Sequence, residues 1–209
     1  MKKQHKLATV VLGLFFVFAL VLSPGAVARE ATNPAVYISY DAETLEELST
    51  VRGTEPLVEA LENSRDEFVR AHAVQLLGEC GDPRAVDPLI SALGDENLYV
   101  RAYAACSLAE YDDPKIAEHL AEALQDPEPY VRANTAWALG RLNDPWAVDP
   151  LISALADEAP EVRANAAWAL GEIGGHSAVK HLKRALDDEN ATVRENSEKA
   201  LKSIMGEPI

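Results

Sequence analysis

The sequence is poor in the residues that most often carry catalysis. Its 209 residues include two cysteines, Cys80 and Cys106, and no cysteine or histidine spacing typical of a zinc site. It also lacks the Gly-x-Ser-x-Gly nucleophile pattern and a phosphate-binding glycine loop. No pair of carboxylates is marked out as a general acid and base. We therefore expect no catalytic residue, no metal and no cofactor, and histidines without ligand spacing at His72, His119, His176 and His181.

Basic residues are scarce as well. Lysine and arginine number 19 against 34 aspartates and glutamates, so the net charge is −15. An acidic surface repels phosphate backbones and anionic lipid, which argues against nucleic acid as a binding partner. Solubility alone accounts for such a charge, and a basic partner or diffusely held cations are the alternatives.

One long uncharged run lies at the N-terminus. Residues 7–22 are uncharged, follow the basic stretch MKKQHK, and precede a Ser-Pro-Gly break and the small-x-small triplet Ala26-Val27-Ala28. This pattern predicts a secretory signal peptide over residues 1–28, whose removal takes away three lysines and changes the net charge from −15 to −18. A retained membrane anchor is the alternative, although about 20 apolar residues are needed to span a bilayer. We expect an extracytoplasmic (periplasmic or secreted) protein without stable membrane insertion after cleavage.

A unit of fixed length fills most of the remaining chain. Val-Arg pairs recur every 31 residues, and AVDPLISAL occurs identically at residues 85–93 and 147–155. Five copies predict a stacked repeat array at about 53–84, 85–115, 116–146, 147–177 and 178–209. The first copy carries one inserted residue, because Pro56 lies 32 residues before Pro88. Residues 29–52 form an N-terminal segment that we expect to end in a capping helix.

Each unit predicts two helices. Asp-Pro opens the first helix in three copies, where aspartate caps free amides and proline suits the first turn. Pro88 and Pro150 should bend or delay this helix. The second helix is predicted to begin at the valine of each Val-Arg pair. It should end at or just past a helix-ending glycine at Gly78, Gly140 or Gly171.

A helical wheel of the third copy separates its second helix into three sides. The predicted core stripe consists of Val131, Thr135, Ala138, Leu139 and Leu142. Small residues on one flank should let the neighbouring unit approach closely. Trp137 lies opposite the core, beside Asn134 and Arg141. In the last copy Glu195, Glu198 and Lys199 replace small residues, as expected for a polar cap.

These motifs resemble a known repeat family. Val-Arg-x-x-Ala-Ala-x-Ala-Leu-Gly followed by Ala-Val-x-Pro-Leu-Ile-x-Ala-Leu resembles HEAT repeats, especially the short phycobilisome-lyase-like (PBS lyase HEAT-like) subclass. The resemblance covers about residues 53–205. It implies an all-α fold, a right-handed α-solenoid (alpha-alpha superhelix, armadillo/HEAT-like) of five helix pairs, with the second helices on its concave side. The 34-residue tetratricopeptide and Thr-Pro-Leu-His ankyrin patterns do not fit.

The outward positions of the second helices are the candidate binding surface. Exposed aromatic side chains surrounded by polar groups are typical of protein interfaces. The candidates for contact with a protein or peptide are Tyr103, Asn134, Trp137, Arg141, Asn165 and Trp168. Alternatively, each indole packs over the small residues of the next unit and has no binding role.

Four arginines favour a structural role. Arg101, Arg132, Arg163 and Arg194 each follow an aspartate by six residues, namely Asp95, Asp126, Asp157 and Asp188, and in the first copy the acid moves to Asp66. This spacing predicts a ladder of buried salt bridges and turn caps. Cys80 at a core position and Cys106 in the outward column should lie too far apart for a disulfide.

The most consistent hypothesis is an exported HEAT-repeat scaffold that binds a protein or peptide partner on its concave second-helix face. The alternative is a lyase-like or metal-dependent hydroxylase-like enzyme, or a subunit of one. Deoxyhypusine hydroxylase, which has similar repeats, binds iron through His-Glu dipeptides, and this chain has only the reversed Glu118-His119. Similarity to bilin lyases concerns the scaffold and not an active site.

Overall fold

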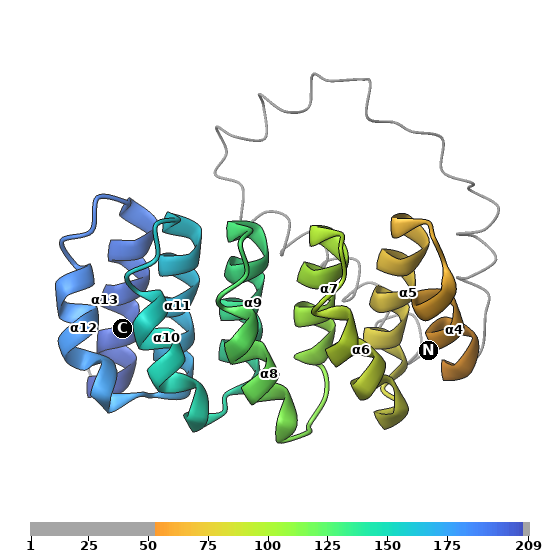
Figure 1. Cartoon of the computed structure of the whole chain (residues 1–209). Coiled ribbons are helices and arrows are strands. Elements are labelled where there is room, and N and C mark those ends of the chain that lie inside the picture. Colours follow the sequence, from red (N-terminus) through yellow and green to blue (C-terminus); the bar gives the residue numbers. More distant parts are fainter. Residues whose placement is uncertain (1–52, 207–209) are drawn as a thin grey trace, which may run out of the picture. The chain divides into compact units, whose positions relative to one another are not determined.

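The computed structural model describes residues 53–206, which fold into helices and short connections with no strand in that range. The predicted signal peptide over residues 1–28 and the capping helix before residue 53 lie outside the described residues. Five helix pairs follow one another (Figure 1): α4 (Thr54–Asn63) with α5 (Glu67–Cys80), α6 (Val86–Ala92) with α7 (Leu98–Leu108), α8 (Lys115–Ala123) with α9 (Pro129–Leu142), α10 (Val148–Ala154) with α11 (Pro160–Ile173), and α12 (Val179–Ala185) with α13 (Ala191–Met205).

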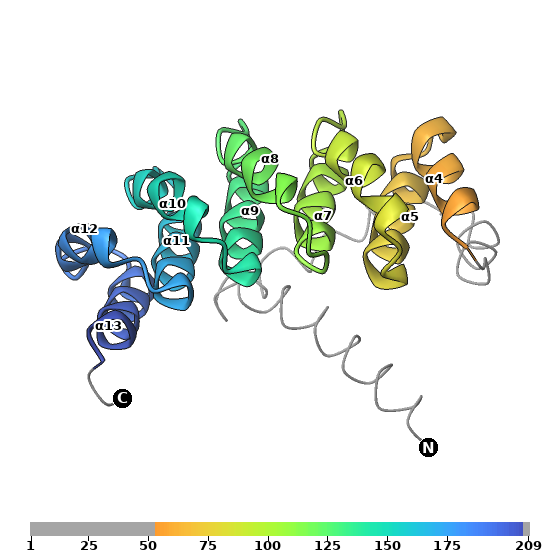
Figure 2. The same cartoon turned by 90° about the horizontal axis from the view of Figure 1, so that it is seen from below.

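The helices of this array form two rows. In Figure 2 the second helices α5, α7, α9, α11 and α13 follow the inner side of the bend, and the first helices follow the outer side. Each second helix packs against the second helix of the next repeat, whereas each first helix mainly contacts its own second helix. The array is therefore an α-solenoid of five helix pairs, as the repeat pattern predicts.

Small residues allow the second helices to approach one another. A Cβ atom on Gly140 would lie 2.7 Å from the Cβ of Ala169 in the next repeat. Gly171 and Gly78 meet Ala200 and Ser107 at similarly short range. These three close contacts lie between consecutive second helices, which pack extensively against one another along the array.

The starts of α6 and α10 are delayed, as their internal prolines predict. Short 3-10 turns at Pro83–Ala85 and Pro145–Ala147 precede α6 and α10. The carboxylates of Asp82 and Asp144 accept the first free amides of these turns. The α-helix then begins two residues before Pro88 or Pro150, so the proline falls in its first turn, where no backbone hydrogen bond is lost.

The second helices begin two residues earlier than predicted. Asp66, Asn97 and Asn190 cap three of them, and Pro129 and Pro160 occupy the first position of two others. Three second helices, α5, α9 and α11, end just past the predicted glycines, as expected, but these glycines were wrongly predicted to be the helix-ending residues. Gly78, Gly140 and Gly171 lie inside their helices. The left-handed residues that end them come three positions later, at Gly81, Asn143 and Gly174.

A continuous core runs through the array. The predicted stripe of α9 is confirmed, since Val131, Thr135, Ala138 and Leu139 have no exposed surface and Leu142 is half-buried. Fully buried leucines repeat at the same two positions of successive units: Leu77, Leu108, Leu139 and Leu170 on second helices, and Leu89, Leu120, Leu151 and Leu182 on first helices. The C-terminal cap is confirmed as well, because Glu195, Glu198 and Lys199 are exposed and Glu198 binds Lys202 at 2.8 Å.

Candidate interaction face

The arginine ladder connects neighbouring repeats. Arg132 donates through Nε and Nη2 to the two carboxylate oxygens of Asp157, at 2.8 and 2.9 Å. The same bidentate arrangement joins Arg70 to Asp95, Arg101 to Asp126 and Arg163 to Asp188. The predicted ladder is confirmed, but the predicted pairing was wrong. Each arginine binds the carboxylate 25 residues ahead, in the next repeat, and not the one six residues behind.

The six-residue spacing serves the backbone instead. Arg132 Nη1 donates to the backbone oxygen of Asp126, six residues earlier, at 2.8 Å. The carboxylate of Asp126 also caps its own turn by accepting from the amide of Glu128. In the first repeat Ser64 supplies the equivalent backbone oxygen to Arg70, and Asp66 caps α5. These guanidiniums hold turns and neighbouring repeats together, so they do not belong to a binding surface.

The asparagine column also stabilises the stack. Asn165 and Asn196 donate to the backbone oxygens of Ala133 and Ala164 in the preceding second helix, at 2.8 and 2.9 Å. Asn134 is only 3% exposed and donates to the oxygen of Tyr130. As a contact residue Asn134 is therefore a wrong prediction, because its amide is consumed inside the array. Asn165 is half-buried and keeps part of its surface outside.

The two repeated tryptophans are half-buried on the second-helix face. Both pack against the core with part of the indole left exposed. Trp168 covers Gly140, because a Cβ there would lie 2.7 Å from its Cζ3 atom. Trp168 therefore packs on a small residue of the preceding repeat, whereas the packing alternative placed each indole over the next repeat. One edge of the Trp168 indole is buried against the stack, and the rest of the ring faces outward.

Arg141 lies over the exposed part of Trp137. Its guanidinium carbon is 5.8 Å from the indole centroid, within the range of a cation–π contact. The same guanidinium approaches the carboxylate of Glu110 on the preceding repeat at 3.9 Å. Both charged side chains remain about half exposed. The face thus contains a guanidinium placed between an indole and a carboxylate.

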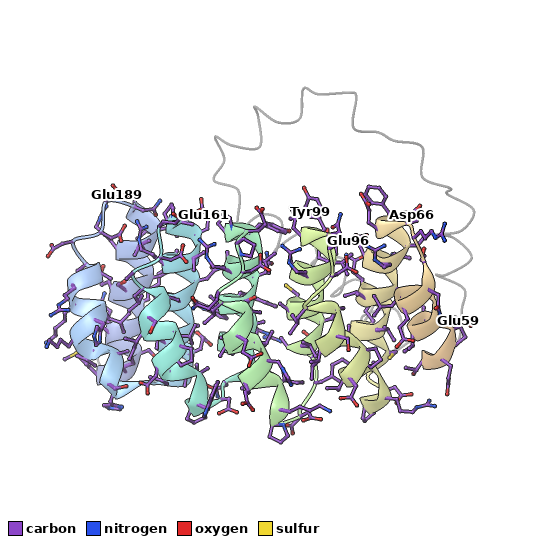
Figure 3. The ribbon with its side chains drawn as sticks, in the orientation of Figure 1. Glu59, Asp66, Glu96, Tyr99, Glu161 and Glu189 are labelled. Atoms are coloured by element: carbon purple, nitrogen blue, oxygen red, sulfur yellow. The ribbon has the colours of Figure 1, made fainter. Side chains whose placement is uncertain are left out.

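Two tyrosines extend this aromatic surface and were missed by the sequence analysis. Tyr99 and Tyr130 meet edge to face, with ring centroids 5.9 Å apart. Tyr99 is 51% exposed, and burial raises the pKa of Tyr130. Each lies four residues before an outward position, Tyr103 or Asn134, so one further helical turn on the wheel would have found both. Tyr99 lies at the edge of the array where first and second helices connect (Figure 3).

Carboxylates border the aromatic surface on two sides. Glu79, Glu110 and Glu172 are exposed at the C-terminal ends of second helices. At the opposite edge Glu96, Glu158 and Glu189 have side chains 84–87% exposed beside the arginine ladder. Figure 3 shows Glu96, Glu161 and Glu189 along this edge. We call the exposed and half-buried second-helix residues between these borders, together with Glu79, Glu110 and Glu172, the inner face.

The cysteines are free thiols. Cys106 donates to the side-chain oxygen of Asn134 at 3.3 Å. Burial, assisted by the charge of Glu110, raises the pKa of Cys106 to about 12. Cys80 was predicted in the core but is exposed, because α5 continues past Gly78 and carries it to the edge.

Trp146 is a further exposed aromatic residue that the sequence analysis missed. It is 54% exposed on the turn between α9 and α10, away from the inner face. With Pro145, Pro150 and Ser177 it lines an open pocket of about 450 Å³. Within residues 53–206 no cluster of histidine, cysteine or acidic side chains is arranged to hold a metal ion. None of the helices in that range is long and apolar enough to cross a membrane.

The fold and the repeated inter-repeat contacts define a helical-repeat protein. The model of the family HEAT repeats matches residues 54–128 and 117–202, so the chain belongs to the HEAT-repeat family. This confirms the resemblance inferred from the sequence motifs. Comparison with curated proteins gives no match.

Solved structures share this architecture. The complex of CpcE and CpcF of phycocyanin lyase from Nostoc sp. PCC7120 is similar, with 27% identity, a TM-score of 0.68, and coverage of 76% of this chain and 67% of that chain. Human deoxyhypusine hydroxylase has 25% identity, a TM-score of 0.52, and coverage of 91% and 88%. A designed armadillo repeat protein in complex with the peptide (KR)4 has 21% identity, a TM-score of 0.57, and coverage of 78% and 86%. This last likeness concerns the fold alone.

Proposed function

We propose that this HEAT-repeat protein is an exported scaffold that binds a segment of another protein on its inner face. The observation that carries the proposal is the aromatic surface across three consecutive repeats, formed by Tyr103, Trp137 and Trp168. Arg141 and Asn165 place polar groups beside the indoles. Large aromatic residues beside arginine are the composition that protein interfaces favour.

Two further observations support a protein partner. The arginine and asparagine ladders join neighbouring repeats through contacts that do not involve the indoles, which leave part of their surface exposed. The similar lyase structure is itself a complex of two chains, CpcE and CpcF. An acidic surface also disfavours nucleic acid.

Export is the second part of this proposal and rests on the N-terminal sequence. A basic start, an uncharged run over residues 7–22 and the triplet ending at Ala28 support cleavage there. Cell fractionation with N-terminal sequencing of the mature chain tests it. A mature protein that begins at Arg29 in the extracytoplasmic fraction supports export. A chain that keeps residues 1–28 in the membrane fraction supports the anchored alternative.

The binding proposal is tested by capture from an extracytoplasmic extract. The double variant Trp137→Ala/Trp168→Ala should lose a protein that the wild type retains, because both indole surfaces disappear. Trp146→Ala is the matched control, since it removes an exposed indole away from the inner face and should retain the protein. Circular dichroism establishes that each variant keeps its helices. Equal capture by all three proteins contradicts the proposal.

Photo-crosslinking provides a second measurement that does not depend on the stability of the tryptophan variants. A photoreactive side chain at position 172 lies on the inner face, whereas one at position 118 lies on the first helix α8. The captured protein should crosslink from position 172 and not from position 118. Crosslinks from position 118 alone would place the interface on the other row of helices.

An enzyme built on the same repeats is the second candidate. Its support is the similarity to phycocyanin lyase and deoxyhypusine hydroxylase at 27% and 25% identity. The chain has no His-Glu dipeptide with which to reproduce an iron site of the hydroxylase type. Metal analysis of the purified protein separates the two candidates, because stoichiometric iron or zinc would favour the enzyme.

A further inference from the structure

We propose, building on the binding function above, that the inner face recognises a positively charged, extended segment of its partner protein. Lysine or arginine side chains of that segment would lay their aliphatic parts on the indoles and direct their charges to the bordering carboxylates. The presence of an interface does not by itself specify which chemical groups of a partner bind there.

The protein's own Arg141 shows the chemistry that this face accepts. It lies over Trp137 at 5.8 Å and approaches Glu110 at 3.9 Å. An indole face attracts a cation through its quadrupole, and the nearby carboxylate adds a direct charge interaction. The intramolecular contact is thus an example of guanidinium binding between these two groups.

The next repeat offers the same two groups to an outside cation. Trp168 repeats Trp137, but the position that Arg141 occupies in the third repeat is Glu172 in the fourth. The indole is half-buried against Gly140 and the carboxylate of Glu172 is exposed. The fourth repeat therefore combines an indole with a carboxylate four residues along, where the third repeat places its own guanidinium.

The charge balance of the inner face favours a cationic occupant. Four ladder arginines are each neutralised by an aspartate of the following repeat. Three of these arginines also contact an exposed glutamate, Glu96, Glu158 or Glu189, at 3.2, 3.4 and 3.5 Å. Since each of the three arginines faces two carboxylates, one negative charge per site is left at the edge. At the other border Glu79, Glu110 and Glu172 outnumber the cations Arg141 and Lys199. Two carboxylate rows therefore enclose an aromatic strip, which suits side chains with an apolar stem and a positive end.

The spacing of the repeats favours an extended segment. Neighbouring packed helices lie about 8–10 Å apart. An extended polyproline-like chain advances about 3.1 Å per residue, so every third side chain returns to the same side after about 9 Å. Cationic side chains at every third residue of the segment would thus meet successive repeats. One such side chain would lie near Trp168, and the others would lie near the exposed aromatic groups of the second and third repeats.

Three peptides of equal length test this proposal on the full mature chain. They are nonapeptides with three repeats of Arg-Ser-Ser, Gln-Ser-Ser or Glu-Ser-Ser, each labelled for fluorescence anisotropy. The arginine peptide should bind, and raising the salt concentration should weaken it. The glutamine and glutamate peptides should not bind at the same concentrations. Equal binding of the glutamine peptide, or no binding of the arginine peptide, overturns the proposal.

Two charge variants locate the interaction with little risk of misfolding. Glu172→Gln should weaken the binding of the arginine peptide about fivefold, which is the effect of losing one exposed charge pair of about 1 kcal/mol. Glu118→Gln is the control, because it removes the same charge from exposed surface on α8 and should leave the affinity unchanged. If both substitutions weaken binding equally, the attraction is diffuse and the proposal is wrong.

Arg141→Gln gives the most specific result. This substitution should tighten the binding of the arginine peptide about threefold to fivefold, because it frees Trp137 and Glu110 and removes a competing charge. Unchanged or weaker binding contradicts the proposal. Loss of captured protein in Trp137→Ala/Trp168→Ala together with tight binding of the glutamine peptide would leave the proposed function standing and reject only the cationic occupant.

Discussion

Arg132 in the third repeat binds Asp157 in the fourth through both carboxylate oxygens, at 2.8 and 2.9 Å. Both side chains are about nine-tenths buried. The contact couples two repeats that are adjacent in space but separated by 25 residues in the chain. Its value to the stack can be measured against Arg194 of the fifth repeat, which donates to the backbone oxygens of Asp188 and Glu189 and makes no such carboxylate contact within the described residues.

Removing one member of this pair should destabilise the array. Asp157→Asn leaves the buried guanidinium of Arg132 with only its longer contact to the exposed carboxylate of Glu158, at 3.4 Å. The loss of the buried counter-charge should lower the free energy of unfolding by about 3 kcal/mol. Urea unfolding followed by circular dichroism measures the change. Arg194→Ala is the control, since Arg194 is exposed and donates only to backbone oxygens of its own turn. An equal loss in both variants would show that the inter-repeat carboxylate contributes little.

Acid should weaken the ladder in a defined pH range. The hydrogen bond from Arg163 holds the pKa of Asp188 below its usual value. A lowered folded-state pKa means that the stabilisation is complete above the unfolded pKa of about 3.9 and is lost as the pH falls through the folded value. We expect stability in urea to decline below about pH 4, and less steeply in Asp188→Asn. An unchanged decline in that variant contradicts the assignment.

Gly140 should tolerate no side chain. Its Cβ would lie 2.7 Å from the Cβ of Ala169 and from Cζ3 of Trp168. Gly140→Ala should therefore lower the melting temperature, although alanine in a helix is otherwise favoured by about 1 kcal/mol. Gly94→Ala is the matched control, because its Cβ would contact only the oxygen of Ser91 at 3.6 Å. A stabilised Gly140→Ala protein would mean that the second helices are less closely packed than described.

The two thiols should differ in reactivity. Burial raises the pKa of Cys106 to about 12, so almost no thiolate forms there at neutral pH, whereas Cys80 is exposed. Alkylation of the folded protein with iodoacetamide at pH 8 should modify Cys80 first, as measured by peptide mass spectrometry. In urea both cysteines should react alike. Faster modification of Cys106 in the folded protein would contradict its burial.

The repeat length predicted much of the architecture. A 31-residue period with apolar positions at helical spacing requires two amphipathic helices per unit, and such units are stable only when stacked. The buried stripe of α9 and the polar cap on α13 followed from the same pattern. The helix ends were less accurate, because several residues can end a helix and only the backbone shows which one does. Gly140 lies inside α9 and packs against the next second helix, and Asn143 ends α9.

The candidate site was predictable only in part. Trp137, Trp168 and Arg141 are on the face where the wheel places them. Asn134 was misplaced because an outward position on one isolated helix becomes buried when the neighbouring helices cover it. Tyr99 and Tyr130 escaped notice because they lie before the Val-Arg pair at which the second helix was thought to begin.

The sequence by itself determined the repeat, the two-helix unit and the residues that form its core, because these depend on local periodicity. The tertiary structure alone decided which atoms of neighbouring repeats meet. The spacing of Asp126 and Arg132 predicted a salt bridge between their side chains. Arg132 instead binds the backbone oxygen of Asp126 and the carboxylate of Asp157, which stacking brings within reach. Contacts across the stack depend on the distance between neighbouring helices. The small residues Gly140 and Ala169 set this distance, so one helix considered alone cannot predict it.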